Sequence, residues 1–163
     1  MNYTELVAAV QSYTENQYST ADINTFIQNA EQRIYNTTQL PDLRKNVTGE
    51  MTLGNKYMGL PTDWLSSFSI AVINSDNEYT YLLNKDVNFI RESFPGPTAT
   101  GVPTHYAIFD DNSFILGPTP NSNYSMELHY FYYPQSIVDA GTSYLGDNFD
   151  SVLLYGSLME AAT

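Results

Sequence analysis

The sequence predicts an α+β fold, in which helices at both ends of the chain enclose a β-rich middle. Three observations predict it. Apolar residues recur at helical spacing over the first third, they alternate with polar residues over the middle, and a nearly all-apolar helical segment closes the chain. At 163 residues the chain has room for one sizeable core, so we expect a single domain over residues 1–163.

Two amphipathic helices are expected to form a helical hairpin over about residues 3–37. Asn2, with Glu5 three residues later, forms a capping-box pattern, and Ser19 with Asp22 repeats a similar helix start. Apolar side chains then follow on one face of each helix, namely Leu6, Ala9, Val10 and Tyr13 in the first and Ile23, Phe26, Ile27, Ala30 and Ile34 in the second. The helices are joined by Glu15-Asn16-Gln17-Tyr18, and Pro41 marks the end of the hairpin.

A β-rich body is expected over about residues 46–135, where the apolar period changes to two. Asp110-Asp111-Asn112 separates two strand-like segments, residues 104–109 and 113–116, which indicates a β-hairpin. The clearest strand places on one face Tyr124, Met126, Leu128, Tyr130 and Tyr132, and on the other Ser125, Glu127, His129, Phe131 and Tyr133. Aromatic residues on both faces predict that this strand is covered on both sides, by a second sheet or by a neighbouring subunit.

A short helix and a loop interrupt the β-rich body. The apolar side chains Val87, Ile90 and Phe94 share one face of the expected helix, for which Asn84 is the expected cap. Residues 95–101 are rich in Pro and Gly, and their length predicts a loop that projects from the body.

The final segment predicts a helix over about residues 148–163, capped by Asp147 or Asn148. Apolar residues surround almost the whole helix, which favours burial on nearly all sides. We therefore predict partner docking through a set of residues in its middle: Leu153, Leu154, Tyr155, Gly156, Leu158 and Met159. The alternative is a central core helix packed by the hairpin and the sheet. Gly156 in mid-helix predicts close approach of another backbone.

Composition favours a protein with permanent protein neighbours. Apolar residues make up 42% of the chain and charged residues only 15%, so Asn, Ser, Thr, Gln and Tyr supply most of the polar surface. The net charge of −12 comes from 18 acidic and 6 basic residues, which argues against binding to nucleic acid or to an anionic membrane. The chain has no cysteine, so disulfides and thiolate metal sites are excluded.

The sequence contains no recognisable catalytic motif, and we predict no catalytic, cofactor-binding or metal-binding residues. His105 and His129 both fall on expected strands with no motif around them, so hydrogen-bonded strand histidines are the favoured interpretation. Asp110-Asp111-Asn112 lacks the alternating oxygen ligands of a calcium loop and fits a β-turn better. A groove lined by some of the 14 tyrosines could bind sugar, although tyrosine is equally typical of half-buried sheets and protein interfaces.

Several short segments, in this order, resemble the head-to-tail adaptor (gateway) proteins of short-tailed bacteriophages. They span nearly the whole chain: Ala30-Glu31-Gln32-Arg33-Ile34-Tyr35, Leu60-Pro61-Thr62-Asp63-Trp64, Gly101-Val102-Pro103-Thr104-His105-Tyr106-Ala107-Ile108, Leu116-Gly117-Pro118-Thr119-Pro120, Tyr124-Ser125-Met126-Glu127-Leu128-His129-Tyr130-Phe131-Tyr132 and Leu153-Leu154-Tyr155-Gly156. The first segment buries its small and apolar residues and leaves Glu31 and Arg33 available for a lateral contact. The second delivers the chain's one Trp into a core.

The resemblance implies a non-enzymatic virion protein at the head–tail interface, made in the cytoplasm of the bacterial host. Copies, about twelve of them, would form a ring between the portal protein and the tail nozzle protein. DNA would pass through without specific binding, because an acidic bore repels it. Two alternatives stay open: another tail, baseplate or receptor-binding (carbohydrate-binding) β-module, and a wall-degrading hydrolase. The helical pattern still runs at Thr163, so we expect the natural chain to continue or its end to order on a partner.

Overall fold

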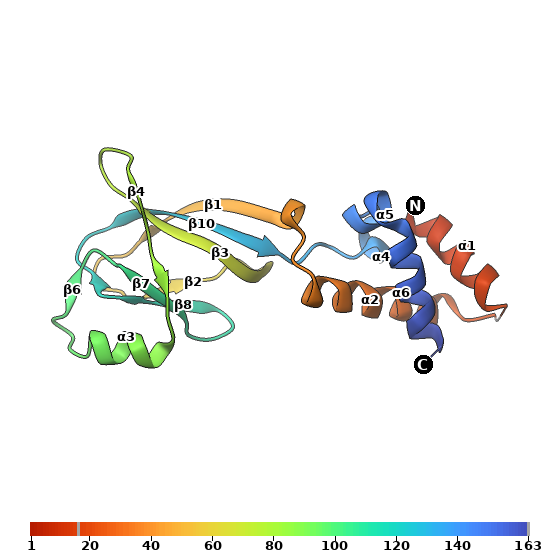
Figure 1. Cartoon of the computed structure of the whole chain (residues 1–163), viewed down its shortest axis with the longest axis horizontal. Coiled ribbons are helices and arrows are strands. Elements are labelled where there is room, and N and C mark those ends of the chain that lie inside the picture. The colour runs from red at the N-terminus through yellow and green to blue at the C-terminus, as the bar shows by residue number, and fades with distance from the viewer. Residues whose placement is uncertain (16, 163) are drawn as a thin grey trace. The chain divides into compact units, whose positions relative to one another are not determined.

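The computed structural model describes residues 1–15 and 17–162, and it has the mixed α+β fold that the sequence predicts. Two compact units make up the fold (Figure 1). The helical unit combines Met1–Leu40 with the segment from Tyr133 to the end of the described chain, and the sandwich unit is Pro41–Tyr132. The single domain expected over residues 1–163 stays a prediction, because two compact units can still unfold as one.

The helices of the helical unit begin at the caps that the sequence predicts. Within the described residues they are α1 (Tyr3–Thr14), α2 (Thr20–Thr37), α4 (Ile137–Ala140), α5 (Tyr144–Asn148) and α6 (Asp150–Ala162). The Asn2 side chain accepts from the Glu5 amide at 2.9 Å and the Glu5 carboxylate accepts from the Asn2 amide at 2.9 Å, which confirms the capping box. Ser19 caps α2 by accepting from the Asp22 amide at 3.1 Å. Asn16, in the expected connection, and Thr163, at the end of the expected final helix, lie outside the described residues.

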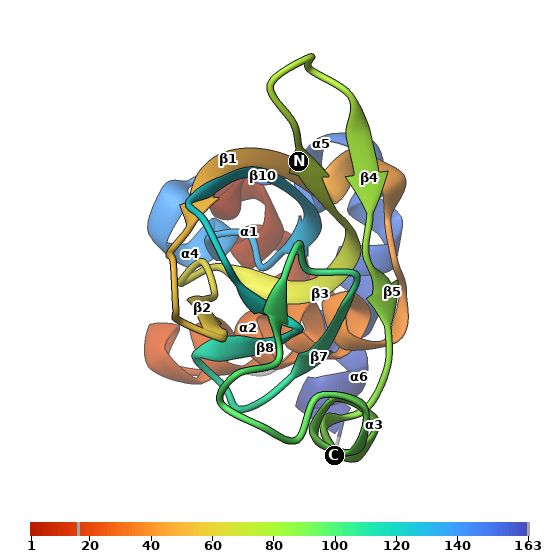
Figure 2. The same cartoon turned by 90° about the vertical axis from the view of Figure 1, so that its left-hand side faces the viewer.

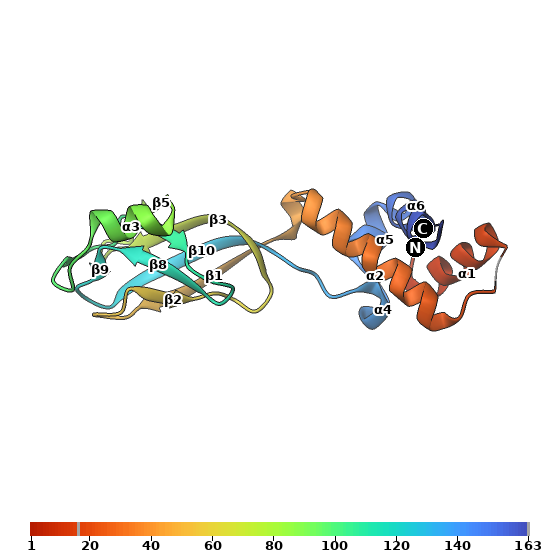
Figure 3. The same cartoon turned by 90° about the horizontal axis from the view of Figure 1, so that it is seen from below.

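Helix α6 packs against both α1 and α2, as Figure 1 and Figure 3 show from two directions. The buried side chains of the three helices come from the apolar stripes predicted for them, and they include Leu6, Val10, Ile23, Ile27, Ala30, Leu153 and Leu154. The two N-terminal helices therefore share a third helix from the other end of the sequence, and burial against α6 stabilises both of them.

The C-terminal helix begins later than predicted. Ser143 caps the short helix α5 by accepting from the Gly146 amide at 3.1 Å, and Phe149 then leaves the helical region with φ −137° and ψ 49°. Helix α6 therefore starts at Asp150 rather than near Asn148, and neither Asp147 nor Asn148 is its cap. Gly146 is required where it stands, because a Cβ atom there would lie 2.4 Å from the Met1 carbonyl oxygen.

Two four-stranded sheets face each other in the sandwich unit (Figure 2). The first sheet is antiparallel, in the order β1 (Arg44–Met51), β10 (Tyr124–Tyr132), β3 (Trp64–Ile73) and β4 (Tyr79–Tyr81). The second has the order β2 (Tyr57–Gly59), β8 (Ser113–Gly117), β7 (His105–Ile108) and β5 (Leu83–Asn84), with β5 parallel to β7. The one-turn 3-10 helix η1 (Pro41–Leu43) precedes β1.

Strand β10 shows the alternation that its sequence predicts. Met126, Leu128 and Tyr130 point inward and are buried together with Phe114 and Leu116 of the opposite sheet. The second sheet therefore covers the inner face of β10. On the outer face, Phe131 and His129 pack edge-on against Phe68, and the Arg44 guanidinium lies 4.8 Å from the Phe68 ring centre.

The rest of the sandwich confirms one hairpin and corrects two details. Strands β7 and β8 pair antiparallel around Asp110-Asp111-Asn112, as predicted. The cap of helix α3 (Val87–Ser93) is Asp86 and not Asn84, because the Asp86 carboxylate accepts from the Phe89 amide at 2.7 Å. The 95–101 loop does not project freely to its end, since β6 (Thr100–Gly101) pairs in parallel with β9 (Thr119–Pro120).

Candidate docking surface

The contact between α2 and α6 depends on two small residues. A Cβ atom added at Gly156 would lie 3.3 Å from the Ala30 Cβ atom, which is tighter than most side-chain contacts, and 3.8 Å from Cδ1 of Ile34. The missing side chain thus lets the two helices approach closely, and this packing offsets the roughly 1 kcal/mol that glycine costs in a helix interior. The backbone approach predicted at Gly156 is therefore made by α2 of the same chain.

A groove of about 430 Å³ lies along this contact, lined by residues of α2 and α6. Ala30, Ile34 and Gly156 line it from the helix–helix contact. Val152, Tyr155 and Met159 also line it, and they are 48%, 55% and 62% exposed. Their spacing of three and four residues places them on one face of α6, so the groove presents an apolar stripe about 10 Å long.

An ion pair borders the groove. An Arg33 guanidinium nitrogen lies 2.9 Å from a Glu160 carboxylate oxygen, and both residues belong to the groove lining. The Arg33 side chain is 64% exposed, so the attraction is screened by water and contributes at most about 1 kcal/mol. Arg33 thus already has an acidic partner within the chain.

Glu31, the other residue predicted to make a lateral contact, is 2% exposed. Its carboxylate accepts a hydrogen bond of 2.9 Å from the Ile137 amide, at the start of α4. Burial raises the pKa of Glu31, and bonds from Ser136 and Ile137 oppose that shift only in part. Glu31 therefore ties α2 to α4, and a lateral contact through Glu31 and Arg33 stays a prediction.

The residues predicted for docking divide into two groups. Leu153 and Leu154 are 1% and 7% exposed and belong to the core of the helical unit, and Leu158 is half-buried. Tyr155 and Met159 face solvent, and Gly156 lies on the groove between them. Docking through this set stays a prediction, to which the structure adds Val152 of α6 and Ile34 of α2. A helical wheel cannot find these two, because it does not tell which apolar side of α6 faces α2.

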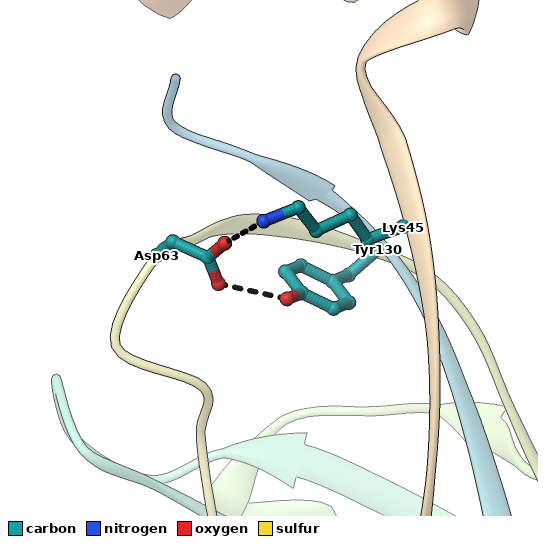
Figure 4. Close-up of polar contacts among 3 residues, drawn as sticks. All are labelled: Lys45, Asp63 and Tyr130. Carbon is teal, nitrogen blue, oxygen red and sulfur yellow. Dashed lines mark hydrogen bonds and ion pairs between the residues drawn. The ribbon is translucent and has the colours of Figure 1, made fainter. Parts of the chain in front are cut away.

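A polar cluster in the sandwich unit fixes the turn that precedes Trp64. Asp63 accepts from the Lys45 ammonium at 2.6 Å and from the Tyr130 hydroxyl at 2.7 Å (Figure 4). Burial would raise the pKa of Asp63, but the bonds from Lys45 and Tyr130 outweigh it and lower that pKa, while burial and the Asp63 carboxylate raise the pKa of Tyr130 to about 12. The Trp64 ring packs edge-on against Phe114, which joins the turn to the core as predicted.

The described part of the chain holds no group of three or more His, Cys, Asp or Glu residues arranged to hold a metal ion. His105 and His129 belong to different sheets and contact aromatic rings, Phe89 and Phe68 respectively. Asp110 accepts from the Asn112 amide and the Ser113 hydroxyl, the bonding of a tight turn, as predicted. No helix among residues 1–15 and 17–162 combines the length and apolarity needed to cross a bilayer.

Comparison with known protein families identifies the family of the chain. The model of the SU10 adaptor protein family matches residues 1–163. The chain therefore belongs to the SU10 adaptor protein family and is a phage adaptor-type structural protein. Membership implies a place in the virion and association with other virion components. A search among curated proteins found no match.

Proposed function

We propose that this protein is the head-to-tail adaptor of a short-tailed phage. Copies, about twelve, form a ring between the portal protein and the tail nozzle protein, and DNA passes through that ring during packaging and ejection. The observation that carries this proposal is the family match over the whole chain, helical unit and sandwich unit alike. That coverage favours an adaptor over a tail, baseplate or carbohydrate-binding β-module, which would not require the helical unit.

The charge distribution supports an open passage for DNA. The helical unit carries eight acidic residues and one basic residue, and the sandwich unit carries ten acidic and five basic residues. Both units are therefore net negative, so whichever lines a bore repels the phosphate backbone and leaves the duplex free to slide. The function is mechanical, and it requires no catalytic group.

Docking is proposed to occur through α6. The buried members of the predicted set, Leu153 and Leu154, hold α6 against α1 and α2. The exposed members, Tyr155 and Met159, then contact the partner from a fixed scaffold. This division of labour is typical of interfaces, in which exposed aromatic residues and methionine supply much of the binding energy.

Assembly with the portal protein of the same phage tests the proposal. We expect native mass spectrometry to show a monomer or a weakly associated species for the isolated protein, and a ring when the portal is added. Electron microscopy of the mixture should place the added density on the portal. A protein that ignores its portal would remove the adaptor assignment, and a stable ring without portal would show that no template is needed.

A further inference from the structure

We propose that the groove between α2 and α6 seats the apolar face of a basic amphipathic helix supplied by a different virion protein. This inference rests on the proposed adaptor function and deepens it, because it states which surface docks and what chemistry the partner brings. Three features carry it: the shape of the groove, the lack of a complementary helix other than α6 in the described part of the chain, and the charge of the helical unit.

The shape of the groove fits a helix. Val152, Tyr155 and Met159 form a stripe over two turns of α6, and the small residues Ala30 and Gly156 leave space open beside them. A third helix packs onto a helix pair by inserting its own ridge of side chains between such rows. Amphipathic helices bind apolar grooves in this way through residues spaced three and four apart. The three half-exposed apolar side chains thus form a surface on which one apolar helix face can pack.

A second copy of the chain offers no suitable helix. Among the described helices outside α6, the large apolar side chains that are exposed are single ones, Tyr13 in α1 and Phe89 in α3. A second copy could therefore place an apolar helix face on the stripe only through its own α6. Such a contact is isologous, so it closes a two-fold dimer and cannot propagate around a ring. A helix that seats in the groove of a ring subunit is therefore expected from a different protein.

The charge of the helical unit selects a basic partner. Its single basic residue, Arg33, is already paired with Glu160, while seven further acidic residues belong to the same unit. Among these, Asp139, Asp147 and Asp150 have exposed side chains around the C-terminal helices. A helix that carries Lys or Arg beside its apolar face is therefore attracted by the net negative charge of the helical unit, which speeds its association.

Methionine methyl NMR on the full chain tests this inference directly. The probe is a Leu/Lys amphipathic helical peptide of about 18 residues, or five turns, added to protein labelled at its methionine methyl groups. The chain has five methionines, and among them Met159 lines the groove. We expect the Met159 signal, assigned with Met159→Leu, to shift while the other four stay in place. A peptide with Glu in place of Lys should leave all five unchanged.

Affinity measurements on variants separate seated docking from general attraction. Met159→Glu makes the protein more acidic, so non-specific attraction to the basic peptide would rise, whereas a helix seated in the groove would lose about tenfold or more in affinity. Leu53→Glu is the matched control, because Leu53 is 61% exposed in the sandwich unit and Met159 is 62% exposed. Equal binding by both variants, or no peptide binding at all, would overturn the inference.

Two further outcomes keep the inference apart from the proposed function. If Met159→Glu binds the basic peptide as the unaltered protein does but still assembles on the portal, the groove inference fails and the adaptor function stands. If the unaltered protein does not bind the portal at all, the adaptor function itself fails. A free protein that is dimeric, and becomes monomeric in Met159→Glu, would assign the groove to a second copy.

Discussion

Two carboxylates of this protein, Glu31 and Asp63, lie in surroundings that shift the carboxyl pKa in opposite directions. Among the described residues, no basic side chain pairs with Glu31: its carboxylate is buried in the helical unit and accepts a hydrogen bond from the Ile137 amide at 2.9 Å. Asp63 instead accepts from Lys45 and Tyr130 at the edge of the sandwich. The first environment raises the carboxyl pKa and the second lowers it, so replacement of each by its amide has opposite consequences.

Glu31→Gln is expected to stabilise the protein at neutral pH. Because burial raises the pKa of Glu31, its contribution to stability is fully present below the carboxyl's unfolded pKa of about 4.3 and is lost as pH rises through the folded pKa. Glutamine keeps an acceptor for Ile137 and never ionises. Urea unfolding at several pH values should therefore show an advantage of Glu31→Gln that grows above about pH 4.

The matched variant Glu31→Leu separates charge from hydrogen bonding. Leucine leaves the buried Ile137 amide without its acceptor, which costs about 1–3 kcal/mol. We expect this variant to unfold at lower urea concentration than the unaltered protein at acidic pH, where Glu31 is neutral and the charge cost has vanished. Equal stability of Glu31→Gln and Glu31→Leu would show that the bond to Ile137 contributes nothing.

Asp63→Asn is expected to destabilise the protein, with the reverse pH dependence. The lowered pKa means that the contribution of Asp63 is present above the carboxyl's unfolded pKa of about 3.9 and is lost as pH falls through the folded pKa. Lys45 is half exposed, so we expect a loss of only about 1 kcal/mol at pH 7, shrinking on acidification. Lys45→Met is the control that removes the cation and keeps its stem. A pH-independent difference would contradict the assignment.

At the scale of elements, α6 joins a buried face to an exposed one. Leu154→Asp should unfold the helical unit, because it places a carboxylate among apolar side chains at a cost of about 3–5 kcal/mol. Tyr155→Asp, the same change one residue further on, should leave the fold intact, since Tyr155 is more than half exposed. Circular dichroism with thermal melting measures both, and portal co-sedimentation then reports docking by the folded variant.

The opposite outcome for this pair is informative. If Leu154→Asp keeps its helical signal and melting temperature, α6 is not a core helix. If Tyr155→Asp melts at a much lower temperature, its ring is held more firmly than the edge-on contact with Tyr13 suggests.

Local signals in the sequence predict several elements well. The structure confirms three such elements: the Asn2–Glu5 capping box, the Ser19 cap and the alternation along β10. Each of them depends only on residues that are close together in the sequence. Elements that depend on distant contacts are predicted less well. The break at Phe149 and the cap at Asp86 each stand close to another residue type that also caps helices, Asn148 and Asn84, and the sequence pattern alone does not distinguish them.

The candidate site shows the same limit. Apolar residues all round α6 indicate a helix with several contacts, but they do not tell which contact is internal. Gly156 was the best local signal, since a glycine in mid-helix predicts a close approach, and that approach proves to be Ala30 of α2. Glu31 and Arg33 were predicted from their place beside small residues, and their intramolecular partners, Ile137 and Glu160, come from the far end of the chain.

At the scale of the whole molecule, connectivity couples the two units. The helical unit is made from both ends of the chain, and the sandwich unit is inserted between them. An unfolded sandwich would turn residues 41–132 into a flexible loop, whose closure costs the helical unit a few kcal/mol. We therefore expect the chain to unfold as the single domain that its sequence predicts.

Two probes test this cooperativity. Trp64, the chain's one tryptophan, reports the sandwich by fluorescence, and circular dichroism at helical wavelengths reports the helical unit. Phe114→Ala removes a fully buried ring from the sandwich and should cost about 3–5 kcal/mol. Both transitions should move together to lower denaturant. A helical transition that stays in place would show two independently stable domains.

The charge of the whole molecule predicts that it does not bind duplex DNA. All six basic residues already have partners within the described chain: Arg33 and Lys45 pair with carboxylates, and a ring lies beneath each of Arg44, Lys56, Lys85 and Arg91. Arg44 and Lys45 share strand β1, and the other four are spread over the rest of the described chain, so no larger cluster neutralises successive phosphates. With a net charge of −12, we expect fluorescence anisotropy with labelled duplex to detect no binding at about 150 mM salt. The signal should stay flat when salt is lowered about tenfold, where even weak phosphate contacts become visible. Salt-sensitive, sub-micromolar binding would contradict a passage that DNA crosses freely, and would point to a dedicated phosphate site.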